Sequence, residues 1–191
     1  MFDYGIQRLP PVAGDRRYHL FDNQGELELV ADFGSPWLPN EPGKQVRFAR
    51  SDGRLVATLD FPDDVFRRKG KEVDKSYAII FDYAVYAIIN ELLLESAEQP
   101  AASFSVEAGG NQWLLVPAGG QTNEFGLHRL PRGYGHYLQP ASAELPEPAS
   151  VIRREAANFD YTATVEHDAL AQPGLVILAL VFLLDGQPQA T

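Results

Sequence analysis

The chain of 191 residues contains no cysteine, and acidic residues strongly outnumber basic ones. Without cysteine it can form no disulfide, no cysteine-ligated zinc site, no iron–sulfur cluster and no thiol nucleophile. The 16 Lys and Arg residues against 26 Asp and Glu give a formal net charge of −10. Because nucleic-acid binding needs a basic surface, this charge argues against nucleic acid as a partner, and against broad adhesion to anionic lipid.

Catalytic and metal-binding motifs are also missing from the sequence. The four histidines are His19, His128, His136 and His167. None of them stands at a short metal-binding spacing, no serine lies in a G-x-S-x-G elbow, and no phosphate-binding loop ending in GK[ST] is present. We therefore expect no metal and no cofactor, and the missing motifs favour a non-catalytic protein over an enzyme without deciding between them.

The sequence also has no pattern typical of a targeting segment or of a membrane-spanning segment. The N-terminus has neither the basic segment nor the apolar segment of a signal peptide. The longest apolar run, LVILALVFLL, is half the length of about 20 residues that a membrane-spanning helix needs. We expect a cytoplasmic protein without a transmembrane segment, whose partner is either a protein or a peripheral membrane surface.

That apolar run, Leu175–Leu184, is the stretch around which we expect the chain to fold. It begins after Pro173 and Gly174 and stops at Asp185, and nothing so apolar can face water on any side. Periodicity alone does not separate a strand buried on both faces from a buried helix. We favour the helix, because leucine and alanine are good helix formers and Gly186 suits the end of one.

Two segments before it have the same pattern and predict hairpins. In Tyr18–Phe33 and Val46–Phe61, alternating residues lead to Asn-Gln-Gly or Ser-Asp-Gly, followed by a second alternating stretch that ends in Asp-Phe. Glycine provides the positive φ that tight hairpin turns need. The two copies predict successive hairpins of one meander or barrel, although shared turn chemistry alone can also produce such a likeness.

Other segments give weaker signals. Residues 1–17 predict an irregular lead-in, because prolines and glycine interrupt any period. In Ser76–Ser96 we expect two strands around a turn at Asp82 and Tyr83 and then a helix from Asn90, with a single long helix as the alternative. Ser103–Gly120 predicts a hairpin. The segment 119–150 predicts loops with one short strand near His136–Leu138. The fold class is therefore mainly β (α+β): a curled or closed antiparallel barrel of about 8–12 strands around a buried apolar C-terminal helix.

The paired hairpins and the terminal segment Phe159–Asp185 together resemble the tubby-like β-barrel group, which includes the LURP-one-related and phospholipid-scramblase-like proteins. The resemblance covers about half of the chain. It implies that residues 1–191 form one tubby-like barrel with the apolar helix threaded through it. It also implies a non-catalytic binding or scaffold role that involves phosphorylated ligands or lipid headgroups.

Two stretches are candidate ligand-binding sites. The first is the basic cluster of Arg67, Arg68, Lys69 and Lys71, whose charges suit phosphate. The second is the glycine-rich stretch GLHRLPRGYGHY, with His128, Arg129, Arg132, Tyr134 and His136. Two alternatives to the binding domain remain: a carrier of a small apolar ligand inside a hollow barrel, and an enzyme with its site in the stretch from His128 to Tyr137.

Overall fold

The computed structural model describes residues 1–12, 15–33, 45–60, 73–92, 103–118, 123–131, 145–154, 159–166 and 170–186. Within these residues it contains twelve β-strands and one α-helix. The strands are β1 (Phe2–Val12), β2 (Asp15–Phe21), β3 (Leu27–Phe33), β4 (Gln45–Ala49), β5 (Leu55–Asp60), β6 (Val73–Phe81), β7 (Ala84–Leu92), β8 (Ser103–Ala108), β9 (Asn111–Pro117), β10 (Glu124–Leu130), β11 (Pro148–Arg154) and β12 (Tyr161–Val165), followed by α1 (Pro173–Leu184).

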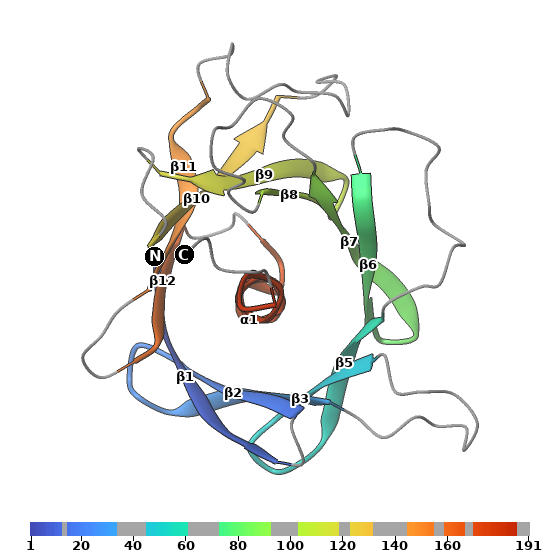
Figure 1. Ribbon diagram of the computed structural model, residues 1–191, viewed down its shortest axis with the longest axis vertical. Coiled ribbons are helices and arrows are strands. Elements are labelled where there is room, and N and C mark those ends of the chain that lie inside the picture. Colours follow the sequence, from blue (N-terminus) through green and yellow to red (C-terminus); the bar gives the residue numbers. More distant parts are fainter. Residues whose placement is uncertain are drawn as a thin grey trace.

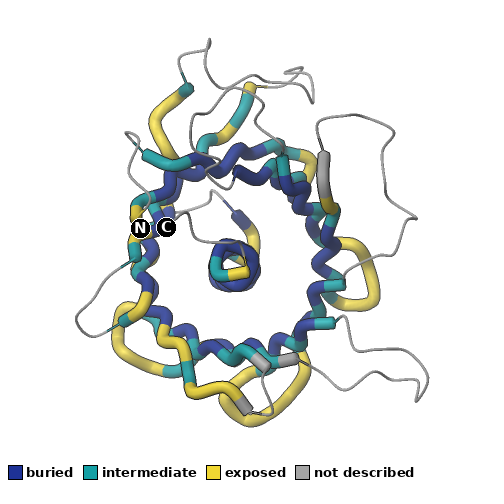
Figure 2. Tube along the Cα trace, in the orientation of Figure 1, coloured by how far each residue is buried: buried dark blue, intermediate teal, exposed yellow. Residues whose placement is uncertain are grey.

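The strands form one closed antiparallel barrel (Figure 1). Each strand pairs with the next in the chain, and β1 closes the ring by pairing with β12, so that Ile6 faces Tyr161. Closure leaves no strand edge unpaired in the ring. Buried and less buried residues alternate along the strands of the ring (Figure 2). On β4, for example, Val46 and Phe48 are buried between half-exposed neighbours.

The expected helix is confirmed: α1 lies inside the barrel (Figures 1 and 2). Every residue from Gly174 to Leu184 is buried, which explains why the run has no polar face. A helix surrounded by a closed sheet meets apolar side chains in all directions, so it needs no polar face. The predicted fold class, a barrel around the C-terminal helix, is therefore confirmed.

The two predicted hairpins are β2–β3 and β4–β5. Gly25 and Gly53 have φ of +79° and +82°, the left-handed conformation that glycine adopts at no steric cost. In the first turn the Asp22 carboxylate accepts hydrogen bonds from the backbone N–H groups of Gln24 and Glu26. The tight turns were thus correctly predicted from their residue types.

The prediction of an irregular lead-in was wrong, because residues 2–12 form β1. The strand lies between β12 and β2 and completes the barrel. The register of β1 against β2 shifts between Leu9 and Val12, and this irregularity contains Pro10 and Pro11. Prolines are tolerated at such a position because they donate no ladder hydrogen bond.

Two further predictions were wrong. Asn90–Leu92 belong to β7 rather than to a helix, since they pair with β8. Glu124–Leu130, expected as loop, form β10, where only Phe125 and Leu127 carry the inward apolar pattern. The residues that follow them, Gly126 and His128, do not give a clear polar alternation, so the pattern was too weak to indicate a strand. The short strand expected near His136–Leu138 lies outside the described residues.

The two ends of the barrel differ. Because neighbouring strands are antiparallel, the tight turns at 22–26, 50–54, 82–83 and 109–110 share one end, which we call the hairpin end. The chain enters the barrel here through Leu170–Gln172, and α1 runs from this end to the other. Asp185 follows the helix at that opposite end, which we call the Asp185 end.

The substitution Ala179→Asp tests the central helix. Ala179 is fully buried at mid-helix, so an unpaired carboxylate there should lower the free energy of unfolding by about 4 kcal/mol or more. Urea denaturation followed by circular dichroism measures the change. In the matched control Val85→Asp the residue is 53% exposed, and a shift of only about 0.5 kcal/mol is expected. Equal stability of the two variants would contradict a helix at the centre of the core.

Candidate binding surface at the hairpin end of the barrel

Polar groups from the barrel wall hold both ends of α1, and the stronger set surrounds Asp185. The Asp185 carboxylate, whose side chain is only 1% exposed, accepts hydrogen bonds from the hydroxyls of Tyr18 and Tyr161. It also forms an ion pair with Arg8, with 2.6 Å between Nη2 and Oδ2. Three strands, β1, β2 and β12, are thereby tied to the residue that ends the helix, which makes this arrangement a structural lock.

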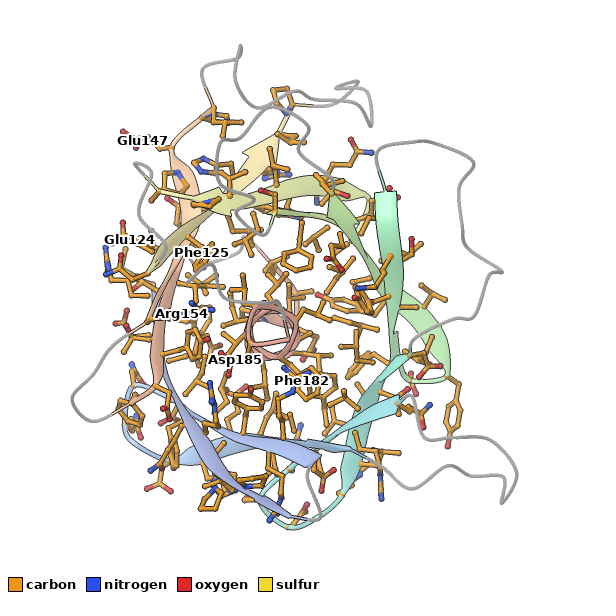
Figure 3. All side chains as sticks on the ribbon, viewed as in Figure 1. Glu124, Phe125, Glu147, Arg154, Phe182 and Asp185 are labelled. Atoms are coloured by element: carbon orange, nitrogen blue, oxygen red, sulfur yellow. The ribbon has the colours of Figure 1, made fainter. Side chains whose placement is uncertain are left out.

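Arginines of the wall complete the lock by binding the last carbonyls of the helix. Arg16 donates to the Phe182 carbonyl at 3.1 Å and lies over the Phe182 ring. Arg154 donates to the Tyr161 hydroxyl and, at 3.4 Å, to the Leu184 carbonyl. Figure 3 labels Arg154 on the wall, and Phe182 and Asp185 beside the helix. Cations at a helix C-terminus offset its partial negative charge. The helix has no basic residue in its own last turn, so the barrel provides them.

At the hairpin end the helix begins without a side-chain cap of its own. Instead the Gly174 N–H donates to the Tyr4 hydroxyl, and the Gln172 N–H donates to the Tyr86 hydroxyl at 3.0 Å. Burial, with the charge of Glu28 nearby, raises the pKa of Tyr4 to about 12, and burial raises the pKa of Tyr86. Two phenols of the wall therefore accept hydrogen bonds at the helix start, as an N-cap side chain otherwise would.

Strand irregularities bring Glu28 and Tyr86 to this place. Between Leu20 and Phe21 the partner on β3 jumps from Leu29 to Leu27, which leaves Glu28 as an extra residue. On β7 the same kind of jump leaves Tyr86 as the extra residue. A bulge re-aims its side chain, and the Glu28 carboxylate comes to lie beside Gly174. Burial, followed by the charge of Asp22, raises the pKa of Glu28.

Exposed apolar side chains gather at the hairpin end. The large hydrophobic residues that are exposed in the described part of the chain are Met1, Phe2, Leu55, Tyr83 and Val85. All of them lie in or beside the turns and strand ends of this end of the barrel. Tyr83 is 102% exposed and, like Asp82, has a positive φ, which is costly for a residue with a side chain. Such a concentration at one end is typical of an interaction surface.

A hollow of about 620 Å3 lies on the barrel wall beside the β6–β7 turn, which contains Asp82 and Tyr83. Its lining includes Arg50 and Arg54 from the β4–β5 turn, Tyr83 from the β6–β7 turn, and an apolar wall with Leu55 and Ile80. We call it the Arg50–Arg54 hollow. Within the described residues neither guanidinium forms an ion pair or a side-chain hydrogen bond. Two acids, Asp60 and Asp82, also line the hollow, and Asp60 accepts a hydrogen bond from Gln45 at 2.7 Å.

Of the predicted site residues, the structure describes only His128 and Arg129. They are neighbours on β10, but their side chains bind different partners. The His128 ring donates from Nδ1 to the Pro146 carbonyl at 2.6 Å. Arg129 donates to the Asn111 side chain at 2.6 Å and lies over the Trp113 ring. The structure thus gives each its own partners, and the remaining predicted residues lie outside the described part: Arg67, Arg68, Lys69, Lys71, Arg132, Tyr134 and His136.

Sequence reasoning missed the residues that hold the helix and the arginines of the hollow. Asp185 was read only as the end of an apolar run, although an acid that ends a fully buried helix needs partners. Tyr4 and Arg8 lay in a segment expected to be irregular. Arg50 and Arg54 flank a turn whose glycine was noticed, while the arginines were not. The alternation of β4 and β5 was the available signal, since it places both residues at the same turn.

The geometry defines a class of protein: a closed antiparallel barrel filled by its own C-terminal helix. Among the described residues, no group of His, Cys, Asp and Glu is arranged to hold a metal ion. In the same part of the chain, no helix is both long and apolar enough to cross a membrane. No protein-family model, curated protein or solved structure matches the chain.

Replacing Asp185 by Asn tests the lock. The amide cannot pair with Arg8 as an ion and cannot accept at both positions from Tyr18 and Tyr161. We expect the free energy of unfolding to fall by about 1–3 kcal/mol. Urea denaturation at neutral pH measures it. The control is Glu124→Gln, which breaks a half-exposed ion pair with Arg153 and should cost about 0–1 kcal/mol. If Glu124→Gln lowered the free energy of unfolding as much as Asp185→Asn, the contacts of Asp185 would contribute no more than a half-exposed ion pair.

Alkaline pH tests the same tyrosines. Burial, together with the hydrogen bond to Asp185, raises the pKa of Tyr18 and of Tyr161 above the ordinary 10.0. A phenol whose pKa is raised by folding stabilises the fold fully below the unfolded pKa, and this stability is lost as pH rises beyond it. We expect the melting temperature to fall from about pH 10 upward, less steeply in Tyr161→Phe. Identical profiles for wild type and variant would contradict the assignment.

Proposed function

We propose that this chain is a cytoplasmic, non-catalytic binding or scaffold domain of the tubby-like barrel group, related to the LURP-one and scramblase-like proteins. We propose further that the hairpin end carries its binding surface, and that the Arg50–Arg54 hollow takes a phosphorylated ligand or a lipid headgroup. The observation that supports this most is the pair of arginines, without ion-pair partners in the described chain, on the wall of one hollow.

The filled barrel supports an external site. Residues Leu175–Leu184 occupy the interior and are all buried, so the space in which a hollow barrel would carry an apolar ligand is taken by the helix. Wall groups fix the helix at both ends, through Asp185 at one and Tyr4 and Tyr86 at the other. A ligand that binds without displacing the helix meets the outer wall or the rims of the barrel, which makes the interior-carrier alternative weaker.

The chemistry of the hollow supports an anionic ligand. Arginine offers a planar set of donors that fits phosphate in a bidentate manner, and two arginines that line one hollow favour a multiply charged group. The net charge of −10 works against adhesion to any anionic surface, so binding must depend on this local cluster. The apolar wall with Leu55 and Ile80, and the exposed ring of Tyr83, can pack against an uncharged part of the same ligand.

The enzyme alternative gains no support from the described residues. It required the side chains of the stretch from His128 to Tyr137 to converge, whereas His128 bonds to Pro146 and Arg129 bonds to Asn111. The other members of that proposed site lie outside the described residues. A binding role is therefore the better proposal for this fold.

Isothermal titration tests the proposed ligand class with three probes: a soluble inositol trisphosphate, inorganic phosphate, and uncharged inositol. We expect the trisphosphate to bind and inositol not to bind. Arg50→Gln and Arg54→Gln should each weaken binding about tenfold, because each removes a charge-assisted hydrogen bond. Arg153→Gln, at the Asp185 end, removes the same charge far from the hollow and should leave the affinity unchanged.

Vesicle sedimentation distinguishes the two sources of phosphate. Phosphatidylcholine vesicles with and without a phosphorylated inositol lipid are compared. Binding to lipid and to the soluble probe, with both lost in R50Q and R54Q, indicates a headgroup site. Binding of the soluble probe alone indicates a free phosphorylated ligand. If neither the soluble probe nor the lipid binds, or if all variants bind equally well, the proposed ligand class is contradicted.

A further inference from the structure

A second cavity lies where the chain enters the barrel. Its volume is about 410 Å3, within the range of small-molecule sites, and we call it the mouth cavity. Phe2, Leu170, Ala171 and Pro173 provide most of its apolar wall, and Tyr86 and Asn111 provide polar groups. It is separate from the Arg50–Arg54 hollow, because the two share no lining residue.

The polar groups of this wall already accept hydrogen bonds, and two of their hydrogen atoms remain available for donation. The Tyr86 oxygen accepts from the Gln172 N–H, and the Asn111 carbonyl oxygen accepts from Arg129. The Gly109 carbonyl accepts from the Asn111 amide at 3.2 Å. The Tyr86 hydroxyl hydrogen and the second Asn111 amide hydrogen have no acceptor within the described residues. A ligand group that accepts hydrogen bonds would therefore meet two available donors in the cavity.

Arg129 adds a positive charge behind this wall. Its guanidinium donates to Asn111 at 2.6 Å and lies 5.6 Å from the centre of the Trp113 ring. Trp113 is 1% exposed, and its indole N–H has no acceptor among the described residues. Arg129 itself is exposed and forms no ion pair in the part of the chain that the structure describes. Asn111 and Tyr86 thus offer hydrogen-bond donors to the cavity, and the Arg129 guanidinium, which is bound to Asn111 beside the lining, adds a cation without an ion-pair partner among the described residues.

From this arrangement we propose that the mouth cavity binds a small amphipathic carboxylate. Its carboxylate lies toward Asn111, Tyr86 and Arg129, and its apolar body packs against Phe2, Leu170 and Pro173. An alcohol of the same size would fill the apolar part but would leave the guanidinium without a counter-charge. An amine would place a second cation beside Arg129. The cavity therefore selects the acid among molecules with the same hydrocarbon body.

The proposal is independent of the proposed phosphate site, because the two rest on different residues and different probes. Octanoate, octan-1-ol and octylamine share one chain and differ only in the head group. Chemical-shift titration of the full chain at neutral pH, with each probe, compares them directly. We expect octanoate to bind at least about tenfold more tightly than octan-1-ol, and octylamine not to bind in the cavity.

Two variants assign the site. Arg129→Gln should remove the preference for octanoate over octan-1-ol while leaving the fold intact, because the residue is exposed. Ala171→Trp fills the cavity from an exposed position and should abolish binding of both probes. Arg153→Gln is the control and should change neither affinity. The result that supports the proposal is a head-group preference that R129Q removes and R153Q keeps.

Three results would overturn the proposal. The first is the absence of octanoate binding. The second is equal affinity for acid and alcohol in the wild-type protein, which would make the cavity a plain apolar one. The third is tighter binding of octylamine, which would assign the cavity to a cation. Retained octanoate binding in A171W, with shifts at residues away from the entry to the barrel, would place the ligand elsewhere and count equally against it.

Discussion

Burial of a helix that is apolar on all sides is the constraint on which this structure depends. A helix usually has one polar face in water, but α1 has none, so a single sheet packed on one side would leave apolar surface exposed. A closed barrel removes that surface from water in every direction. The same closure pairs the strand edges, so that burial of the helix and protection of the edges are achieved by one arrangement.

The two ends of the helix are the difficulty that this arrangement creates. The start and the end of the helix leave N–H and carbonyl groups that find no partner within the helix. The wall satisfies them with long side chains: Tyr4 and Tyr86 at the start, and Arg16 and Arg154 at the end. Asp185 joins the helix to three strands at once. With the interior filled and locked, recognition is left to the rims and the outer wall.

The hairpin end combines the features that recognition requires. Its turns are tight, and the largest exposed apolar groups are concentrated there. Among the hollows that adjoin it, one has two arginines on its wall, and another has unused donors beside Arg129. The first is the proposed site of a phosphorylated group, and the second is the proposed site of a carboxylate with an apolar body. On a chain with a net charge of −10, either site depends on local rather than diffuse positive charge.

The sequence by itself determined the elements whose signal is local. The ten-residue apolar run predicted a buried helix, and Asn-Gln-Gly and Ser-Asp-Gly predicted two hairpins, because hydrophobic pattern and turn chemistry act between near neighbours. Only the tertiary structure decided which distant residues meet. Asp185 pairs with Arg8, which lies 177 positions away in the sequence, and bulges direct the side chains of Glu28 and Tyr86 toward the helix start. Strand order and register fix such contacts, and no local pattern encodes them. The strands β1 and β10 were missed for a different reason: prolines interrupt the pattern of β1, and the apolar alternation of β10 is weak.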